Sequence, residues 1–204
     1  MLESLDRNHY AVIPNFIEGS AIDELLRYAI SKSPDFKSAM IGKGRTKQLL
    51  KTTRNSSIEW IDKWDSSAAH QEIRDKLHLL STTLNRHFYL SLKSFESQFS
   101  FYPIGGYYKK HKDQLDNNKT RQLTAVLFLN DVYSGGELVI YSKDNINKID
   151  TIIPPRAGTL VLFFSSTIFH EVQFCQEERY GLTTWFRDDE IDVPFSKNER
   201  FLHT

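Results

Sequence analysis

The strongest constraint on the fold is a series of short strand-like segments in the second half of the chain. Phe95, Phe99 and Phe101 share one face of the first segment, and polar side chains alternate with them. Turn residues such as Gly105-Gly106 and Pro154-Pro155 separate the segments. About eight strands spaced about ten residues apart predict a β-sandwich, barrel or jelly roll. The later strands are expected over residues 107–113, 123–130, 137–141, 149–153, 159–164, 169–174 and 180–186.

The first part of the chain predicts one short strand and two helices. Tyr10 to Pro14 is an apolar run that ends at proline. A helix is expected over residues 21–31, with Ser20 as its N-cap, because apolar residues recur there at helical spacing. A longer amphipathic helix is expected over residues 68–88. The histidines on or beside it are interpreted as surface residues: His70, His78 and His87.

Composition narrows the class of protein. The chain has 204 residues, and we expect a single domain over 1–204. Its 26 basic and 26 acidic residues give no net charge, which argues against general nucleic-acid binding. The single Cys175 excludes an internal disulfide framework and a cysteine-rich zinc site. No apolar run reaches about 18 residues, and the start of the chain does not resemble a signal peptide. We therefore expect a soluble, cytoplasmic protein that does not bind membranes.

A basic segment from Lys43 to Arg54 contains no acidic residue. One interpretation is a solvated loop or hairpin. The alternative is a cationic lid that closes over a site, because loops often carry function.

A histidine and an aspartate in one predicted strand form the clearest candidate for a metal site. His111 and Asp113 are two residues apart, so their side chains point to the same side of the strand. His170 follows 59 residues later, at the start of another predicted strand. Strands that far apart can be neighbours in a jelly roll. Two histidines and one carboxylate are the facial triad of non-haem Fe(II) oxygenases, although zinc could bind the same set.

Arg179 is the second chemical signal. Strand alternation puts Arg179 on one face with Gly181, Thr183 and Trp185. A buried arginine on such a face requires an anion, and its guanidinium can bind a carboxylate through two parallel hydrogen bonds. The alternative is a surface arginine that pairs with Glu177 or Glu178.

These residues resemble the 2-oxoglutarate- and Fe(II)-dependent dioxygenases. The closest likeness is to bacterial prolyl hydroxylases related to the hypoxia-sensing prolyl hydroxylases of animals. It covers roughly residues 10–187. Beyond the order of His111, Asp113, His170 and Arg179, it rests on residues 54–61, 84–88, 94–96, 102–108, 127–130, 135–138 and 158–186.

The resemblance implies a fold and a set of roles. The fold would be mainly β (α+β), a double-stranded β-helix (jelly roll) with N-terminal packing helices. Helices and strands over about 1–92 would support a core over about 93–187, followed by a tail over 188–204. The implied iron ligands are His111, Asp113 and His170. Arg179, Tyr102 and Thr183 would bind 2-oxoglutarate, and Arg121 and Trp185 would contact the substrate.

One position departs from the family. The eukaryotic members carry a tyrosine whose hydroxyl helps to hold the distal carboxylate of 2-oxoglutarate, and this chain has Phe128 there. Losing a hydrogen bond to a charged group costs about 1.5–3 kcal/mol. Thr124, Tyr133 or a water molecule are the candidates to replace it.

The implied activity is hydroxylation of a prolyl residue in a protein, with release of succinate and CO₂. Its cofactors would be Fe(II), 2-oxoglutarate and O₂, with ascorbate as a reductant. The partner would be a protein substrate, and the enzyme a monomer or weak dimer. Two alternatives remain open. The substrate could be a free amino acid or another small molecule, or the chain could be a catalytically inactive binding module with the same fold.

Overall fold

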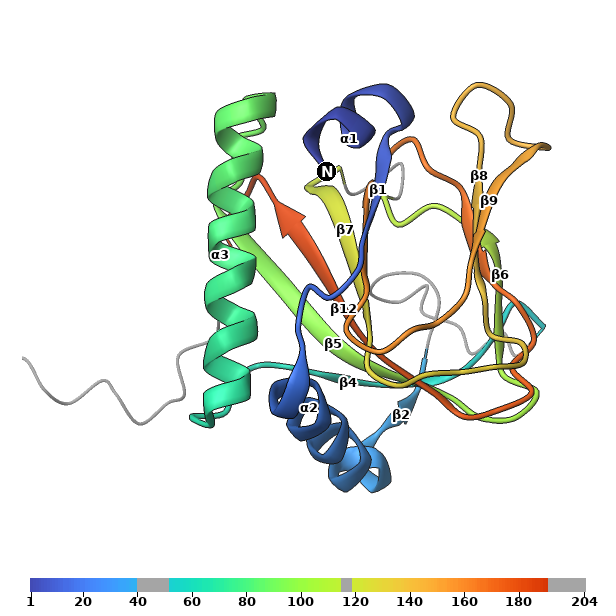
Figure 1. Cartoon of the computed structure of the whole chain (residues 1–204). Helices are drawn as coiled ribbons and strands as arrows, with labels where there is room; N and C mark the ends of the chain where they lie inside the picture. Colours follow the sequence, from blue (N-terminus) through green and yellow to red (C-terminus); the bar gives the residue numbers. More distant parts are fainter. Residues whose placement is uncertain (40–51, 115–118, 191–204) are drawn as a thin grey trace, which may run out of the picture.

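In the computed structural model, which describes residues 1–39, 52–114 and 119–190, two antiparallel sheets face each other (Figure 1). The major sheet has the order β1-β10-β7-β12-β5-β4-β2, and the minor sheet has the order β3-β6-β11-β8-β9. This is the expected double-stranded β-helix. The strands of the major sheet are β1 (Tyr10–Ile13), β10 (Leu160–Phe164), β7 (Arg121–Phe128), β12 (Arg179–Arg187), β5 (Ser94–Tyr102), β4 (Ser57–Trp60) and β2 (Lys37–Ser38). Those of the minor sheet are β3 (Arg54–Asn55), β6 (Tyr107–His111), β11 (His170–Val172), β8 (Leu138–Tyr141) and β9 (Ile149–Ile153).

The helices are α1 (Leu2–Asn8), α2 (Gly19–Lys32) and α3 (Ala68–Phe88), with a short 3₁₀ turn at Ser33–Asp35. The bounds of α3 agree with the sequence prediction. The predicted cap of α2 is wrong, because the helix begins at Gly19 and its N-cap residue is Glu18, which makes no side-chain capping bond. No described helix is both long enough and apolar enough to span a membrane. The greater part of the basic segment, residues 43–51, and residues 191–204 of the tail lie outside the described residues.

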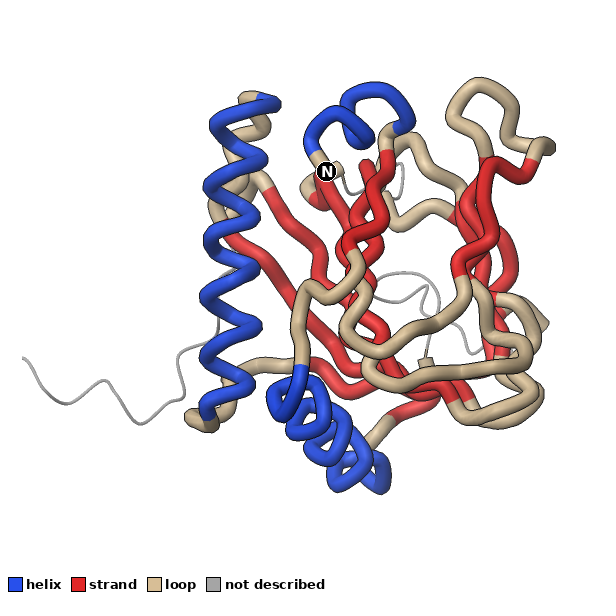
Figure 2. The backbone as a smooth tube through the Cα atoms, in the orientation of Figure 1, coloured by secondary structure: helices blue, strands red, loops and turns tan. Residues whose placement is uncertain are grey.

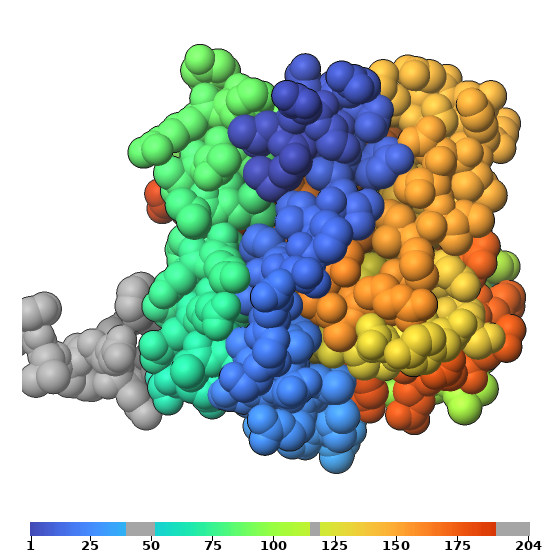
Figure 3. All heavy atoms as spheres, in the orientation of Figure 1, coloured from blue at the N-terminus to red at the C-terminus, as the bar shows by residue number. Residues whose placement is uncertain are grey.

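Two apolar clusters hold the layers together. The larger one joins α2 and α3 to the outer face of the major sheet, where Phe99 and Leu182 are buried. Figure 2 shows α3 along the side of the major sheet that faces away from the minor sheet. The smaller cluster fills the space between the sheets and includes Phe128, Val161 and Ile168. On the face drawn in Figure 3, the N-terminal segment lies between α3 and the C-terminal half of the chain. Beside the smaller cluster, residues of both sheets line a cavity, among them Ser100 of β5, Arg179 of β12 and His170 of β11.

His70 is buried, which corrects the prediction of a surface residue. Its side chain is 1% exposed and lies among the rings of Tyr28, Trp64 and Phe99. It lies on the same face of α3 as Ile73, so the helical spacing could have predicted that His70 is buried. Neither ring nitrogen has a hydrogen-bond partner among the described residues. Burial lowers the pKa of His70, which keeps the imidazole neutral.

Replacing His70 by Phe is expected to reduce the loss of stability at acid pH. The unfolded chain takes up a proton at His70 below about pH 6.5, whereas burial lowers the pKa of His70 in the folded protein. The contribution of His70 to stability is therefore complete above about pH 6.5 and is lost as the pH falls toward the lowered pKa. The measurement is the free energy of unfolding in urea at about pH 7.5 and about pH 5.5.

The matched control is His87→Phe, because His87 is an exposed histidine on the same helix. Its pH dependence should equal that of the wild type. Equal pH dependence in the wild type and in His70→Phe would contradict the assignment.

Candidate active site

Pairing of β6 with β11 brings the three predicted metal ligands together. His170 lies opposite His111 in the register of the two strands. The carboxylate of Asp113 lies beside both rings: Oδ1 is 3.4 Å from His111 Nε2, and Oδ2 is 3.7 Å from His170 Nε2. The three ligand atoms all lie within 4.8 Å of one another. Adjacent ligands of an octahedral ion with bonds of about 2.1 Å lie about 3 Å apart. The cluster can therefore close on a metal ion with small side-chain movements.

Contacts behind the rings fix the orientation of both imidazoles. His111 Nδ1 is 2.8 Å from the Lys109 carbonyl oxygen, and His170 Nδ1 is 3.4 Å from that of Ile168. A ring that donates from Nδ1 presents the lone pair of Nε2 to a metal. The His111 ring also stacks on Tyr108 at a centroid distance of 3.5 Å. The Arg54 guanidinium lies 4.5 Å from the centroid of the Tyr108 ring. These contacts aim both Nε2 atoms at Asp113.

A pair of hydroxyl groups holds the Asp113 carboxylate. Thr124 Oγ1 donates to Asp113 Oδ2 at 2.8 Å, and Ser165 Oγ is 2.9 Å from Thr124 Oγ1. Sequence reasoning proposed Thr124 and Tyr133 as replacements for the missing tyrosine hydroxyl. The structure places Thr124 at Asp113, and Tyr133 is 75% exposed with its hydroxyl near Asp131. The hydroxyl pair itself was not expected from the sequence, because β7 and the end of β10 meet only in the fold.

The charge states of Asp113 and His170 suit a metal. Burial alone would raise the pKa of Asp113, but His170 and His111 hold it well below its usual range. Burial and the nearby His111 lower the pKa of His170 to about 4. At neutral pH the site therefore contains an ionised carboxylate and a neutral His170, which are the forms that bind metal ions.

Arg179 is buried at the start of β12, so the prediction of a buried cation is confirmed and the surface pairing with Glu177 or Glu178 is wrong. Its side chain is 2% exposed, and its Nε has no partner among the described residues. The guanidinium carbon lies 4.9 Å from the Tyr102 ring and 5.0 Å from the Phe128 ring. Burial lowers the pKa of Arg179 and the electrostatic effect of the nearby Tyr102 opposes this shift, but an arginine stays charged in either case. An uncompensated buried cation is the environment that an anionic ligand would complete.

Gly136 makes room for this arginine. Its φ is +70°, and a Cβ at this position would lie 3.1 Å from Arg179 Cδ and 3.0 Å from Cys175 Sγ. A side chain would be strained by the backbone and would press on Arg179. The Gly135-Gly136 turn expected from the sequence thus also has a packing role beside the site.

One cavity of about 500 Å³ contains all of the predicted site residues. Arg179 and Thr183 share its wall with Trp185, as the alternation along β12 predicted. Trp185 packs against Trp60 with ring centroids 5.6 Å apart, and the guanidinium carbon of Arg121 lies 3.8 Å from its ring. The predicted residues on the cavity wall are Tyr102, His111, Asp113, Arg121, His170, Arg179, Thr183 and Trp185. Sequence reasoning missed Gln98 and Ser100, which line the same cavity from β5.

The comparisons with known proteins agree with this geometry. Residues 97–187 match the family model of the 2OG-Fe(II) oxygenase superfamily. A prolyl-4-hydroxylase from Pseudomonas putida is 26% identical, with a TM-score of 0.81 over 93% of this chain and 97% of that one. A prolyl hydroxylase from Trichoplax adhaerens, solved with a peptide fragment of hypoxia inducible factor, is 23% identical with a TM-score of 0.80 over 92% and 87% of the two chains. The search of curated protein sequences found no match.

The matched segment contains every candidate metal ligand and Arg179. The chain therefore carries a 2OG-Fe(II) oxygenase domain and is a 2-oxoglutarate-dependent dioxygenase. Over nearly its whole length it has the fold of a bacterial prolyl hydroxylase.

Substituting Thr124 by Val is expected to weaken metal binding by about tenfold or more, because losing a hydrogen bond to a ligand typically costs 10- to 100-fold in affinity. The substitution removes the 2.8 Å bond to Asp113 with little change in size. The measurement is the affinity for Mn²⁺ or Co²⁺ by calorimetry, without 2-oxoglutarate.

Thr184→Val is the control for this experiment. Thr184 is a buried threonine one strand away, and its hydroxyl contacts Ser97 at 2.8 Å. It does not line the cavity. Wild-type affinity in Thr124→Val would refute a role of the hydroxyl pair in holding Asp113.

Proposed function

We propose that the protein hydroxylates a prolyl residue of a protein substrate, using Fe(II), 2-oxoglutarate and O₂. The observation that carries the proposal is the meeting of His111, Asp113, His170 and the buried Arg179 in one cavity. Support for the prolyl substrate comes from the likeness to the Pseudomonas putida prolyl-4-hydroxylase, which extends over 93% of this chain.

In this proposal His111, Asp113 and His170 hold Fe(II) through two imidazole nitrogens and one carboxylate oxygen. The donor set fits, because two neutral nitrogens and one anionic oxygen suit Fe(II) and leave coordination positions open. With O₂ as the oxidant, bound iron and 2-oxoglutarate would supply the chemistry that converts a C–H bond into a C–OH group and releases succinate and CO₂.

Arg179 binds the distal carboxylate of 2-oxoglutarate through its guanidinium. It lies at the inner part of the cavity wall beside apolar side chains, including Phe128. Water has little access to such a place, so each charge-assisted hydrogen bond is strong. The Tyr102 ring lies 4.9 Å from the guanidinium carbon of Arg179 and restricts its orientation, and Thr183 lies on the same strand face as Arg179. Because Phe128 has no hydroxyl, Arg179 and Tyr102 are the residues that recognise the distal carboxylate of 2-oxoglutarate.

The substrate approaches over Arg121 and Trp185. Both lie on the cavity wall, and the exposed edge of the neighbouring Trp60 extends the aromatic surface toward solvent. A flat aromatic surface beside hydrogen-bond donors is suited to a proline ring and the adjacent peptide groups. The Trichoplax adhaerens enzyme, whose fold this chain shares, was solved with a peptide.

Further features stay predictions. They are a requirement for ascorbate as reductant, a cytoplasmic location, and a monomeric or weakly dimeric state. The single domain over residues 1–204 also stays a prediction.

Replacing Arg179 by Gln is expected to weaken 2-oxoglutarate binding about 100-fold or more, since two charge-assisted hydrogen bonds are lost. Metal affinity should stay within about twofold, because Arg179 contacts no metal ligand in the described structure. The measurement is calorimetric titration of the Zn²⁺-loaded protein with 2-oxoglutarate. Arg156→Gln, at an exposed arginine that lies over Tyr133, is the control and should bind normally. Normal 2-oxoglutarate affinity in Arg179→Gln would exclude this role.

The substrate class is tested with a panel of synthetic peptides that contain proline, next to free amino acids. With Fe(II), 2-oxoglutarate and air, wild-type protein is expected to add the mass of one oxygen atom to a prolyl residue of some peptides. His111→Ala should abolish this addition, which mass spectrometry of the peptides measures. Hydroxylation of free amino acids alone would favour the small-molecule alternative. Binding of Fe(II) and 2-oxoglutarate without turnover of any tested compound would favour the inactive binding module.

A further inference from the structure

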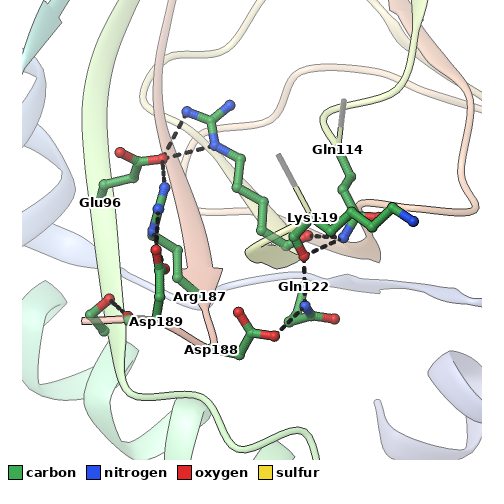
Figure 4. A network of polar contacts seen from close by, with 9 residues as sticks. Glu96, Gln114, Lys119, Gln122, Arg187, Asp188 and Asp189 are labelled. Carbon is green, nitrogen blue, oxygen red and sulfur yellow. Dashed lines mark hydrogen bonds and ion pairs between the residues drawn. The ribbon is translucent and has the colours of Figure 1, made fainter. Parts of the chain in front are cut away.

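Four charged side chains form a row of alternating sign beside the cavity. Asp189 pairs with Arg187, Arg187 pairs with Glu96, and Glu96 pairs with Arg121. The four residues come from the ends of β12, β5 and β7. Figure 4 shows Glu96, Arg187 and Asp189 in one row across neighbouring strands. Only Arg121 of these four residues lines the cavity.

Glu96 determines where the Arg121 guanidinium lies. Both Nε and Nη2 of Arg121 donate to Glu96 Oε1 at 2.8 Å. The guanidinium carbon is 3.8 Å from the Trp185 ring. The carboxylate of Glu96 thus holds one edge of the guanidinium, and the Trp185 ring holds one face. Glu96 makes no bond to Nη1, so this nitrogen can donate to another group. Arg121 has little freedom to reorient.

The row is balanced in charge. Arg187 binds Asp189 through two bonds of 2.8 and 2.9 Å and donates to Glu96 Oε1 at 2.8 Å. Hydrogen bonding to Asp189 raises the pKa of Arg187, and the same contact lowers the pKa of Asp189. With Arg187 neutralised by Asp189, the charge of Glu96 is available to neutralise Arg121. The side chains of Glu96 and Arg121 are each 22% exposed, so solvent screens this pair only in part.

Two arginines therefore line one cavity in opposite electrostatic states. Arg179 has no carboxylate partner in the described residues, whereas Arg121 is bound to one. An unpaired guanidinium attracts a carboxylate. A paired one still donates hydrogen bonds but offers little net charge to an anion. The same cavity of about 500 Å³ therefore contains one arginine suited to an anion, Arg179, and one suited to a neutral hydrogen-bond acceptor, Arg121.

We propose that Glu96 is a positioning residue that determines specificity: by neutralising Arg121 and holding it flat on Trp185, it makes this part of the cavity select uncharged peptide groups and disfavour acidic ones. The ligand class is a backbone carbonyl or another neutral acceptor of the substrate, next to the residue that is hydroxylated. This substrate assignment rests on the proposed function, but the neutralisation of Arg121 can be measured without any substrate.

The experiment follows the indole N–H signal of Trp185 by ¹H–¹⁵N NMR during a titration with sulfate. Trp185 Nε1 is buried and has no partner among the described residues, and its ring contacts the Arg121 guanidinium. The protein is loaded with Zn²⁺ and saturating 2-oxoglutarate, so that Arg179 is already occupied. A Trp185→Phe variant assigns the signal.

Wild type is expected to give no saturable shift, because Arg121 is neutralised. Glu96→Gln frees the guanidinium and should give a saturable shift, with an apparent sulfate affinity at least about tenfold above the upper limit set by the wild-type titration, as expected for one added charge-assisted hydrogen bond. Glu96→Gln combined with Arg121→Gln should lose the response, which excludes sulfate bound at other cations. Asp188→Asn is the matched control. It removes one negative charge at the end of the same strand, where Asp188 contacts Gln122 and not Arg121, and it should behave as wild type.

Glu96→Gln also removes a partner of Arg187, so the double variant Glu96→Gln with Arg187→Gln repeats the test without an unpaired Arg187. This variant keeps the net charge of the wild type and still frees Arg121. A saturable shift in the wild type, or no shift in both Glu96 variants, would overturn the proposal.

The peptide panel then tests the substrate class. Glu96→Gln is expected to gain turnover of peptides with an acidic residue beside the proline, relative to neutral peptides, with the change in KM and not in kcat. If the sulfate result is as expected but no peptide is turned over by any variant, the neutralisation holds and the prolyl assignment fails. Equal KM ratios for acidic and neutral peptides in wild type and Glu96→Gln would overturn the specificity role.

Discussion

The antiparallel pairing of β6 with β11 is the constraint on which the site depends. It places His170 opposite His111, although 59 residues separate them in the sequence. Asp113 then reaches both rings because it follows His111 by two positions. The other sheet contributes the buried arginine, since β12 runs between β5 and β7 and presents Arg179 to the same cavity. The candidate metal ligands and Arg179 thus come from different sheets, and how the two sheets face each other determines their relative positions.

Local periodicity accounts for what could be predicted from the sequence. The alternation from Arg179 to Trp185 indicates which side chains share a face, and helical spacing gave the bounds of α3. The predicted strand over residues 107–113 is too long, because β6 ends at His111; Asp113 still lies beside His111 from the segment that follows the strand. His70 could have been predicted too, because it lies one helical turn before Ile73 on the buried face. Its residue type misled the interpretation, since histidine is more often partly exposed.

The contacts that were missed join strands whose neighbours cannot be read from one sequence. Thr124 meets Asp113 and Ser165 only after β7 pairs with β10. Glu96 lies opposite Trp185 in the register of β5 and β12, and Arg187 follows Trp185 on the same face. Alternation does predict that Arg187 and Arg179 share a face. Alternation does not predict that Glu96 and Asp189 pair with Arg187, nor that Arg179 Nε has no partner among the described residues.

The buried charge of Arg179 links the stability of the folded chain to the supply of its ligand. Burying a guanidinium without an anion is costly, and Arg179 Nε has no partner in the described structure. If a dicarboxylic acid binds Arg179 as proposed, it offsets this cost only in the folded state, so the folded population would grow with the concentration of free ligand. Proteases in the cell act on the unfolded fraction. The abundance of this protein would then follow the metabolic level of the acid, and starvation for it would shorten the lifetime of the chain as well as slow its reaction.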